Sequence, residues 1–119
     1  AMIPHGVEIF VSLDPIDMRL GFDRLAGLVE ATMGRSPRSE AMFLFFGKRR
    51  TSLKILFFDG TGLCIFYKRL DKGTFRLPVP DGDAKVIELE ERALDALLDG
   101  IDVESGRIEK GLGTKRRVH

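Results

Sequence analysis

Three short apolar runs, separated by residues typical of turns, limit the folds open to this chain more than any other feature. They are Met42–Phe46, Leu53–Phe58 and Leu63–Tyr67, and all three contain aromatic residues. Runs of this length and composition predict strands rather than helices. The sequence Asp-Gly-Thr-Gly at residues 59–62 predicts a tight hairpin between the second and third runs. Alternating apolar residues over 75–79 predict a fourth strand, so an antiparallel β-meander is expected.

The meander needs a cover for its apolar face, and the flanking sequence supplies one. Apolar and polar residues alternate over residues 7–13, which predicts a half-buried strand. Helical spacing of apolar residues over 18–33 predicts an amphipathic helix, with Asp17 as its N-cap and Gly34 at its end. A shorter helix is expected over residues 89–98. The predicted fold class is α+β: a mostly antiparallel β-meander packed by one long amphipathic helix, plus a shorter C-terminal helix.

Length and composition agree with one folded domain. The chain has 119 residues, of which 44% are hydrophobic and 31% are charged, a balance typical of globular proteins. We expect a single α+β domain over residues 3–103 and a flexible basic tail over 104–119. The sequence shows no apolar run approaching ~20 residues, no signal-peptide pattern and only one cysteine, Cys64. We therefore expect a cytoplasmic protein with no membrane span and no intrachain disulfide.

A net charge of only +1 conceals a strong separation of charge along the chain. Residues 43–76 carry a formal charge of +6, whereas residues 77–104 carry −7. Alternate turns of an antiparallel meander lie at the same end of the sheet, so the turns at 47–52 and 70–73 are expected to lie together. Seven cations would then form one basic pole, the predicted DNA-binding site: Lys48, Arg49, Arg50, Lys54, Lys68, Arg69 and Lys72.

DNA binding is the hypothesis that this basic pole favours, because cations on turns can reach phosphates. An acidic protein partner and the protection of sheet edges by charge are the alternatives. The opposite charges of the two blocks, together with an exposed sheet edge, also predict a homodimer.

A catalytic constellation is not evident, and we expect a non-enzymatic protein that uses no metal and no cofactor. His5 and His119 are poorly placed as acid–base groups, and Cys64 lies within an apolar run. The carboxylates best suited to a metal are Asp17, Asp23 and Asp59. The first is better explained as a helix cap, the second as the ion-pair partner of Arg19 four residues earlier, and the third as a turn former. A metal-dependent nuclease is therefore the weakest functional alternative.

Three motifs, in order along the chain, resemble those of a bacterial family. The first is Asp17-Met18-Arg19-x-Gly21-Phe22-Asp23. The second comprises Lys54-Ile55-Leu56-x-x-Asp59-Gly60-x-Gly62-Leu63 and Tyr67-Lys68-Arg69-Leu70-x-x-Gly73-x-Phe75, and the third is Leu94-x-x-Leu97-Leu98-x-Gly100-Ile101-Asp102. They cover roughly residues 3–103 and resemble the small accessory proteins, usually labelled TnpB, encoded by the second reading frame of IS66-class insertion sequences.

The resemblance implies a role in bacterial transposition, beside a separate transposase that carries the catalytic acids and a companion accessory protein. It also implies DNA, at the transposon ends, as a partner. The expected function is thus a non-catalytic accessory factor that binds DNA. The alternative is a protein–protein adaptor that bridges transposase components through the acidic block 81–104 or the C-terminal helix. Arg19 and Asp23 belong to the family motif and are expected on an exposed helix face, as an ion pair or as contacts to DNA or a partner.

Overall fold

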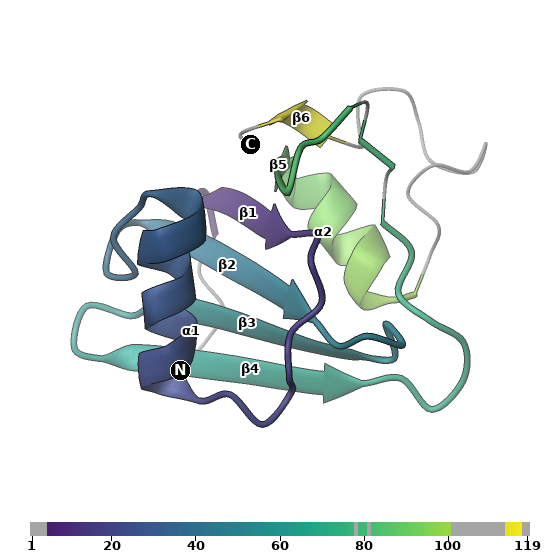
Figure 1. Ribbon diagram of the computed structural model, residues 1–119, viewed down its shortest axis with the longest axis horizontal. Helices are drawn as coiled ribbons and strands as arrows, with labels where there is room; N and C mark the ends of the chain where they lie inside the picture. The colour runs from purple at the N-terminus through teal and green to yellow at the C-terminus, as the bar shows by residue number, and fades with distance from the viewer. Residues whose placement is uncertain (1–4, 78, 81, 101–113, 118–119) are drawn as a thin grey trace.

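A single sheet with helices on both faces forms the centre of the protein (Figure 1). The computed structural model describes residues 5–77, 79–80 and 82–100 and the backbone of 114–117. The strand order is β4-β3-β2-β1-β5-β6. In chain order the elements are β1 Glu8–Ser12, α1 Phe22–Leu28, η1 Val29–Met33, β2 Ala41–Phe46, β3 Ser52–Phe58, β4 Leu63–Arg69, β5 Val86–Leu89, α2 Glu91–Leu98 and β6 Thr114–Arg117. Within the described ranges, no helix is long and apolar enough to cross a bilayer.

The predicted meander is confirmed for β2, β3 and β4. β2 pairs antiparallel with β3, and β3 pairs antiparallel with β4, with Ser52 opposite Arg69. α1 and η1 cover one face of these strands, and α2 covers the other. Every residue of β2 is therefore buried, which explains why its sequence is continuously apolar rather than alternating.

The sheet is mixed, so the expectation of a mostly antiparallel meander needs correction. β1 pairs parallel with β2, with Ile9 opposite Met42 and Val11 opposite Leu44. Parallel neighbours need a crossover connection, which the α1–η1 segment provides between β1 and β2. The strand–helix–strand order over residues 7–46 is the sequence signal that could have predicted this parallel pair. On its other side, β1 pairs antiparallel with β5.

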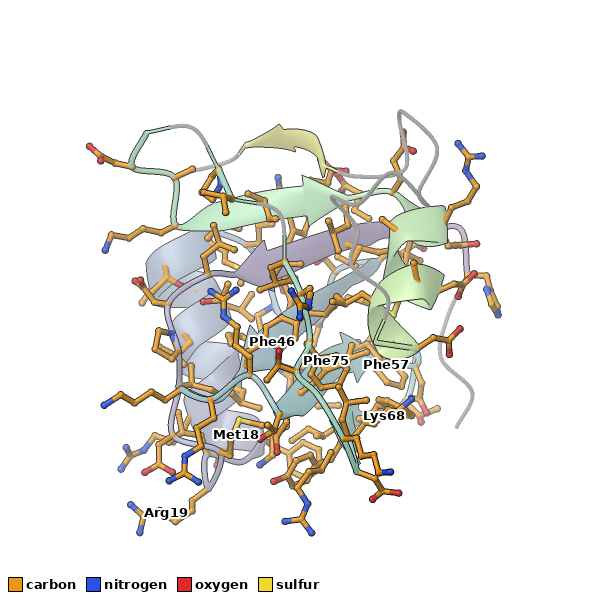
Figure 2. The ribbon with its side chains drawn as sticks, turned by 90° about the vertical axis from the view of Figure 1, so that its right-hand side faces the viewer. Met18, Arg19, Phe46, Phe57, Lys68 and Phe75 are labelled. Carbon is orange, nitrogen blue, oxygen red and sulfur yellow. The ribbon has the colours of Figure 1, made fainter. Side chains whose placement is uncertain are left out.

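The fourth strand predicted over residues 75–79 is wrong. Phe75 and Leu77 are buried but belong to no strand, and residue 78 lies outside the described residues. The Phe75 ring instead meets the Phe46 ring edge-on, with 5.6 Å between centroids, on the face that α2 covers (Figure 2). Pro78 and Pro80 in the sequence have no N–H to give to a ladder. The alternation of apolar residues reflects burial against a sheet face rather than membership of the sheet.

The helix predicted over 18–33 is shorter than expected, because it begins at Phe22. Asp17 does not cap it, since its carboxylate accepts hydrogen bonds from the backbone and guanidinium of Arg19. The preceding segment is held extended instead: Ile16 forms a parallel bridge with Gly47 and donates its N–H to the Phe46 carbonyl at 2.9 Å. The helix ends as predicted, at Gly34 with a left-handed φ of 64°.

The C-terminal helix is confirmed as α2, whose Ala93, Leu94 and Leu97 are buried against the sheet. The predicted flexible tail, 104–119, lies mostly outside the described residues, as does the predicted domain boundary after residue 103. Within the tail, the backbone of Thr114–Arg117 forms β6 and pairs antiparallel with β5.

Candidate nucleic-acid interface

The turn after β2 and the turn after β4 lie at the same end of the sheet, as the sequence predicted (Figure 1). Two backbone hydrogen bonds join them: Leu70 N–H donates to the Thr51 carbonyl at 2.9 Å, and Phe75 N–H donates to the Arg50 carbonyl at 2.7 Å. The two turns therefore form one continuous rim, although about 20 residues separate them in the chain.

Five of the seven predicted cations lie on this rim, and none of them forms an ion pair with another described residue. We call these five residues the basic rim: Lys48, Arg49, Arg50, Arg69 and Lys72. Four of them are exposed, and Arg50 is half-buried. Arg50 has a left-handed φ of 57°, which bends the backbone sharply within the turn. Asp71 is the acidic residue within the turn after β4, so the rim is strongly positive.

Lys54 and Lys68, the other two predicted cations, serve the fold. Lys54 is only 8% exposed; its Nζ donates to the Leu20 carbonyl at 2.8 Å and lies 4.9 Å from the centre of the Tyr67 ring. On the opposite face of the sheet, Lys68 Nζ donates to the Leu98 carbonyl at 2.7 Å (Figure 2). That carbonyl belongs to the last turn of α2, where a cation also favours the helix dipole. Each ammonium thus already donates a hydrogen bond within the fold.

Arg19 does not pair with Asp23, so that expectation is wrong. Arg19 Nη2 lies 2.7 Å from Asp17 Oδ2, and the guanidinium and backbone N–H of Arg19 lower the pKa of Asp17 to about 2. Arg19 precedes α1 and lies beside Met18, whose side chain packs where a Cβ on Gly47 would be. Figure 2 shows Met18 close to the sheet and Arg19 extending outward. The structure thus adds Arg19 to the same end as the basic rim, which sequence reasoning missed because it placed Arg19 inside a helix.

The three candidate metal-binding carboxylates do not converge. Asp59 lies in the β3–β4 hairpin, at the far end of a seven-residue strand that spans about 20 Å, whereas Asp17 lies near Gly47. Hydrogen bonds from the backbone N–H and hydroxyl of Thr61 and from Gly62 N–H lower the pKa of Asp59 to about 2. Asp59 is thus the turn former that its sequence context indicated. Among the described residues, no three metal-binding side chains come together.

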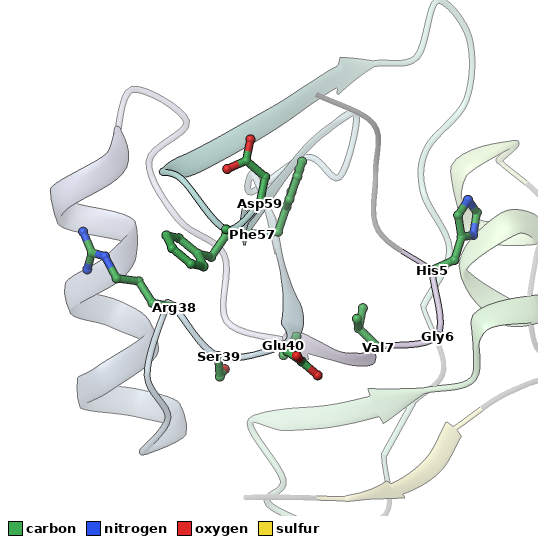
Figure 3. Close-up of a pocket in the computed structure, with 11 residues that line it drawn as sticks. His5, Gly6, Val7, Arg38, Ser39, Glu40, Phe57 and Asp59 are labelled. Atoms are coloured by element: carbon green, nitrogen blue, oxygen red, sulfur yellow. The ribbon is translucent and has the colours of Figure 1, made fainter.

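A pocket of about 630 Å³ lies at the end of the sheet opposite the basic rim (Figure 3). The chain before β1, the loop before β2 and the β3–β4 hairpin line it, contributing among others His5, Glu40 and Asp59. The His5 imidazole lies 3.7 Å from Glu91, outside hydrogen-bond distance. The Asp59 carboxylate already accepts hydrogen bonds from Thr61 and Gly62 within its own turn. Desolvation and the nearby Asp59 raise the pKa of the Cys64 thiol, which is the opposite of the shift that activates a cysteine as a nucleophile.

Comparison with known proteins gives a family match and two uncharacterized relatives. A family model described as IS66 Orf2 like protein matches residues 7–107. The uncharacterized protein y4hO of Sinorhizobium fredii is 38% identical over 103 residues, which cover 85% of this chain and 88% of that protein. The uncharacterized protein y4jC of the same organism is 31% identical over 99 residues, which cover 82% of each. No solved structure matches the chain significantly.

Proposed function

This chain belongs to the IS66 Orf2-like family and is thus an insertion-sequence-associated accessory protein; we propose that it is a non-catalytic factor that binds the DNA of the transposon ends through its basic rim. The single observation that carries the proposal is the joining of two cationic turns into one rim by the Leu70–Thr51 and Phe75–Arg50 hydrogen bonds. A protein with a net charge of +1 places five cations at one end of a sheet, where they can contact several phosphates at once.

The proposal includes the partners that the family implies. In it, the protein acts in the cytoplasm beside the transposase and the companion accessory protein, and it works as a homodimer. β4 lies at an edge of the sheet, and an edge strand offers unpaired backbone groups to a second copy. Light scattering checks the dimer: a monomer mass at high protein concentration would remove it from the proposal.

An adaptor role is the second candidate, and one feature of α2 favours it. Its apolar side faces the sheet, so the exposed side is what a partner would meet. Glu91, Asp95 and Asp99 are exposed at intervals of four residues and form an acidic stripe along that side. A basic partner surface would complement this stripe. The test asks whether the protein captures the transposase. If the double variant Asp95→Asn and Asp99→Asn loses this capture while its DNA binding is unchanged, the adaptor role is favoured.

The test of DNA binding compares a duplex carrying the element's terminal inverted repeat with a random duplex, over a range of salt concentrations. Replacing Lys48 and Arg49 with Ala is expected to weaken binding to both duplexes and to reduce the slope of log affinity against log salt by about 1.8, since each phosphate contact contributes about 0.9. Replacing the exposed Arg38 and Arg92 with Ala is the matched control, because it removes the same charge away from the rim.

Three results would contradict the proposal. One is a salt slope that the rim variant does not change. Another is an equal loss of affinity in the control variant, which would indicate a general charge effect. The third is Mg²⁺-dependent nicking of the duplex that Asp59→Asn abolishes, which would indicate a nuclease instead.

A further inference from the structure

Two aromatic side chains are unusually exposed, and both lie on the face of the sheet that α1 covers. Among the described residues, the large hydrophobic side chains at the surface are Phe22, Tyr67 and Val79, which are 49%, 55% and 77% exposed. Tyr67 is on β4 at the edge of the sheet, and Phe22 is the first residue of α1, which packs on β3 and β4. Core packing explains neither exposed ring, since each leaves about half of its surface in water.

Lys54 links the positions of the two aromatics. Its ammonium lies 4.9 Å from the centre of the Tyr67 ring and donates a hydrogen bond to the Leu20 carbonyl. Phe22 is two residues beyond Leu20, and two residues span at most about 7 Å. The buried cation therefore fixes one end of β4 and the start of α1 against each other. Because Tyr67 meets Lys54 but remains 55% exposed, much of its surface is still available to a ligand.

The charges beside the two rings are mainly positive. Arg69 is exposed and lies two positions after Tyr67, on the same face of β4. The Arg19 side chain is 92% exposed, and Arg24 is exposed in the first turn of α1. The nearby acids are Asp17, which pairs with Arg19, and Asp23, which is exposed. Because Arg19 and Asp17 pair with each other, the remaining charges are Arg24 and Arg69 against Asp23, and this excess of positive charge favours an anionic ligand.

From this arrangement we propose that the Tyr67–Phe22 surface binds a single-stranded nucleic acid segment, with bases stacking on the two rings and phosphates meeting Arg19 and Arg69. This inference rests on the proposed DNA-binding function. It adds that the surface beside the start of α1 accepts nucleic acid in single-stranded form. Aromatic rings interleaved with cations are the surface that unpaired bases need, because every base has a face that can stack. The bases of an intact duplex have no such free face.

The chain carries its own probe for this contact, since Tyr67 is its one tyrosine and it has no tryptophan. Intrinsic tyrosine fluorescence therefore reports on Tyr67 alone. The titration uses an oligothymidylate of about 12 nucleotides, within the usual site size, and an abasic oligomer of equal length and charge. Stacking predicts quenching of the fluorescence by the oligothymidylate and little change with the abasic oligomer.

Substitutions then measure the contribution of the ring by anisotropy of the labelled oligomers. Tyr67→Ala is expected to weaken oligothymidylate binding about 5- to 150-fold, which corresponds to about 1–3 kcal/mol at 1.4 kcal/mol per tenfold. Tyr67→Phe keeps a ring and should retain the affinity. Val79→Ala is the control, because Val79 follows a segment packed on the opposite face of the sheet. Thermal unfolding of each variant verifies that it is folded.

The outcomes separate this inference from the proposed function. If the duplex binds through the basic rim but the oligothymidylate binds no better than the abasic oligomer, the single-strand site is refuted and the duplex proposal stands. An unchanged affinity in folded Tyr67→Ala also refutes it. If Tyr67→Ala loses transposase capture while nucleic-acid binding is unchanged, the surface serves a protein partner and the inference is wrong.

Discussion

Replacing Lys54 with Met separates the structural from the nucleic-acid roles of the cations. The side chain is 8% exposed, and its ammonium makes two contacts: a 2.8 Å hydrogen bond to the Leu20 carbonyl and a cation–π contact at 4.9 Å with Tyr67. Methionine keeps the apolar stem and removes both contacts. A hydrogen bond from a charged donor contributes about 1.5–3 kcal/mol and the cation–π contact about 1 kcal/mol. Relief from burying the ammonium offsets part of this, so we expect a net loss of about 2 kcal/mol.

Urea unfolding followed by far-ultraviolet circular dichroism measures the loss, which should appear as a lower midpoint at unchanged slope. In thermal unfolding it corresponds to a fall in Tm of about 6–10 °C for a chain of this length. Lys48→Met, on the exposed rim, is the control and should change stability by less than about 0.5 kcal/mol. A double-mutant cycle with Tyr67→Leu isolates the cation–π contact.

The reasoning would be refuted if Lys54→Met were as stable as the wild type, since neither contact would then contribute appreciably. It would also be refuted if folded Lys54→Met reduced the salt slope of duplex binding, as the joint replacement of Lys48 and Arg49 with Ala is expected to do. That result would mean that Lys54 leaves its buried partners and reaches a phosphate.

Two further predictions concern the turn at Asp59 and the contact at Gly47. The pKa of Asp59 is lowered from 3.8 to about 2 by its hydrogen bonds, so the stability it provides is complete above about pH 5 and is lost as the pH falls towards 2. Asp59→Asn should therefore lose less stability than the wild type between pH 5 and 2 in acid titrations, and an identical acid profile would contradict the role of the turn. A Cβ on Gly47 would come within 2.9 Å of Met18 Cγ, so Gly47→Ala should destabilise by about 1–2 kcal/mol through overpacking. Adding Met18→Ala should then cost less in the Gly47→Ala background than in the wild type, and additive losses in urea unfolding would refute the contact.

Local sequence signals predicted several parts of the structure correctly. Gly34 ends the helix where its left-handed φ is required, and Asp59 forms the hairpin turn with its own side chain. The strands of the meander followed from the length and composition of their apolar runs. In each case the determining interactions lie within a few residues along the chain, so the information is present in the local sequence.

The start of α1 was predicted incorrectly because a distant contact overrode local propensity. Residues 18–21 have the apolar spacing of a helix, but Ile16 bridges to Gly47 and Met18 packs beside it. These tertiary contacts hold the segment outside the helix, and Asp17 then pairs with Arg19 instead of capping. The same limitation applies to Phe75, whose burial the sequence indicated but whose placement on a sheet face it did not.

The sequence by itself determined that two cationic turns meet at one end of a sheet, because alternate turns of any antiparallel meander must do so. Only the tertiary structure decided which cations remain available there. Lys54 and Lys68 belong to the same cationic set as Arg69 in the sequence, yet they donate to the Leu20 and Leu98 carbonyls. Those acceptors belong to segments that pack on opposite faces of the sheet, about 30 residues away along the chain. A side chain's charge is encoded locally, whereas its access to solvent depends on which elements fold over it.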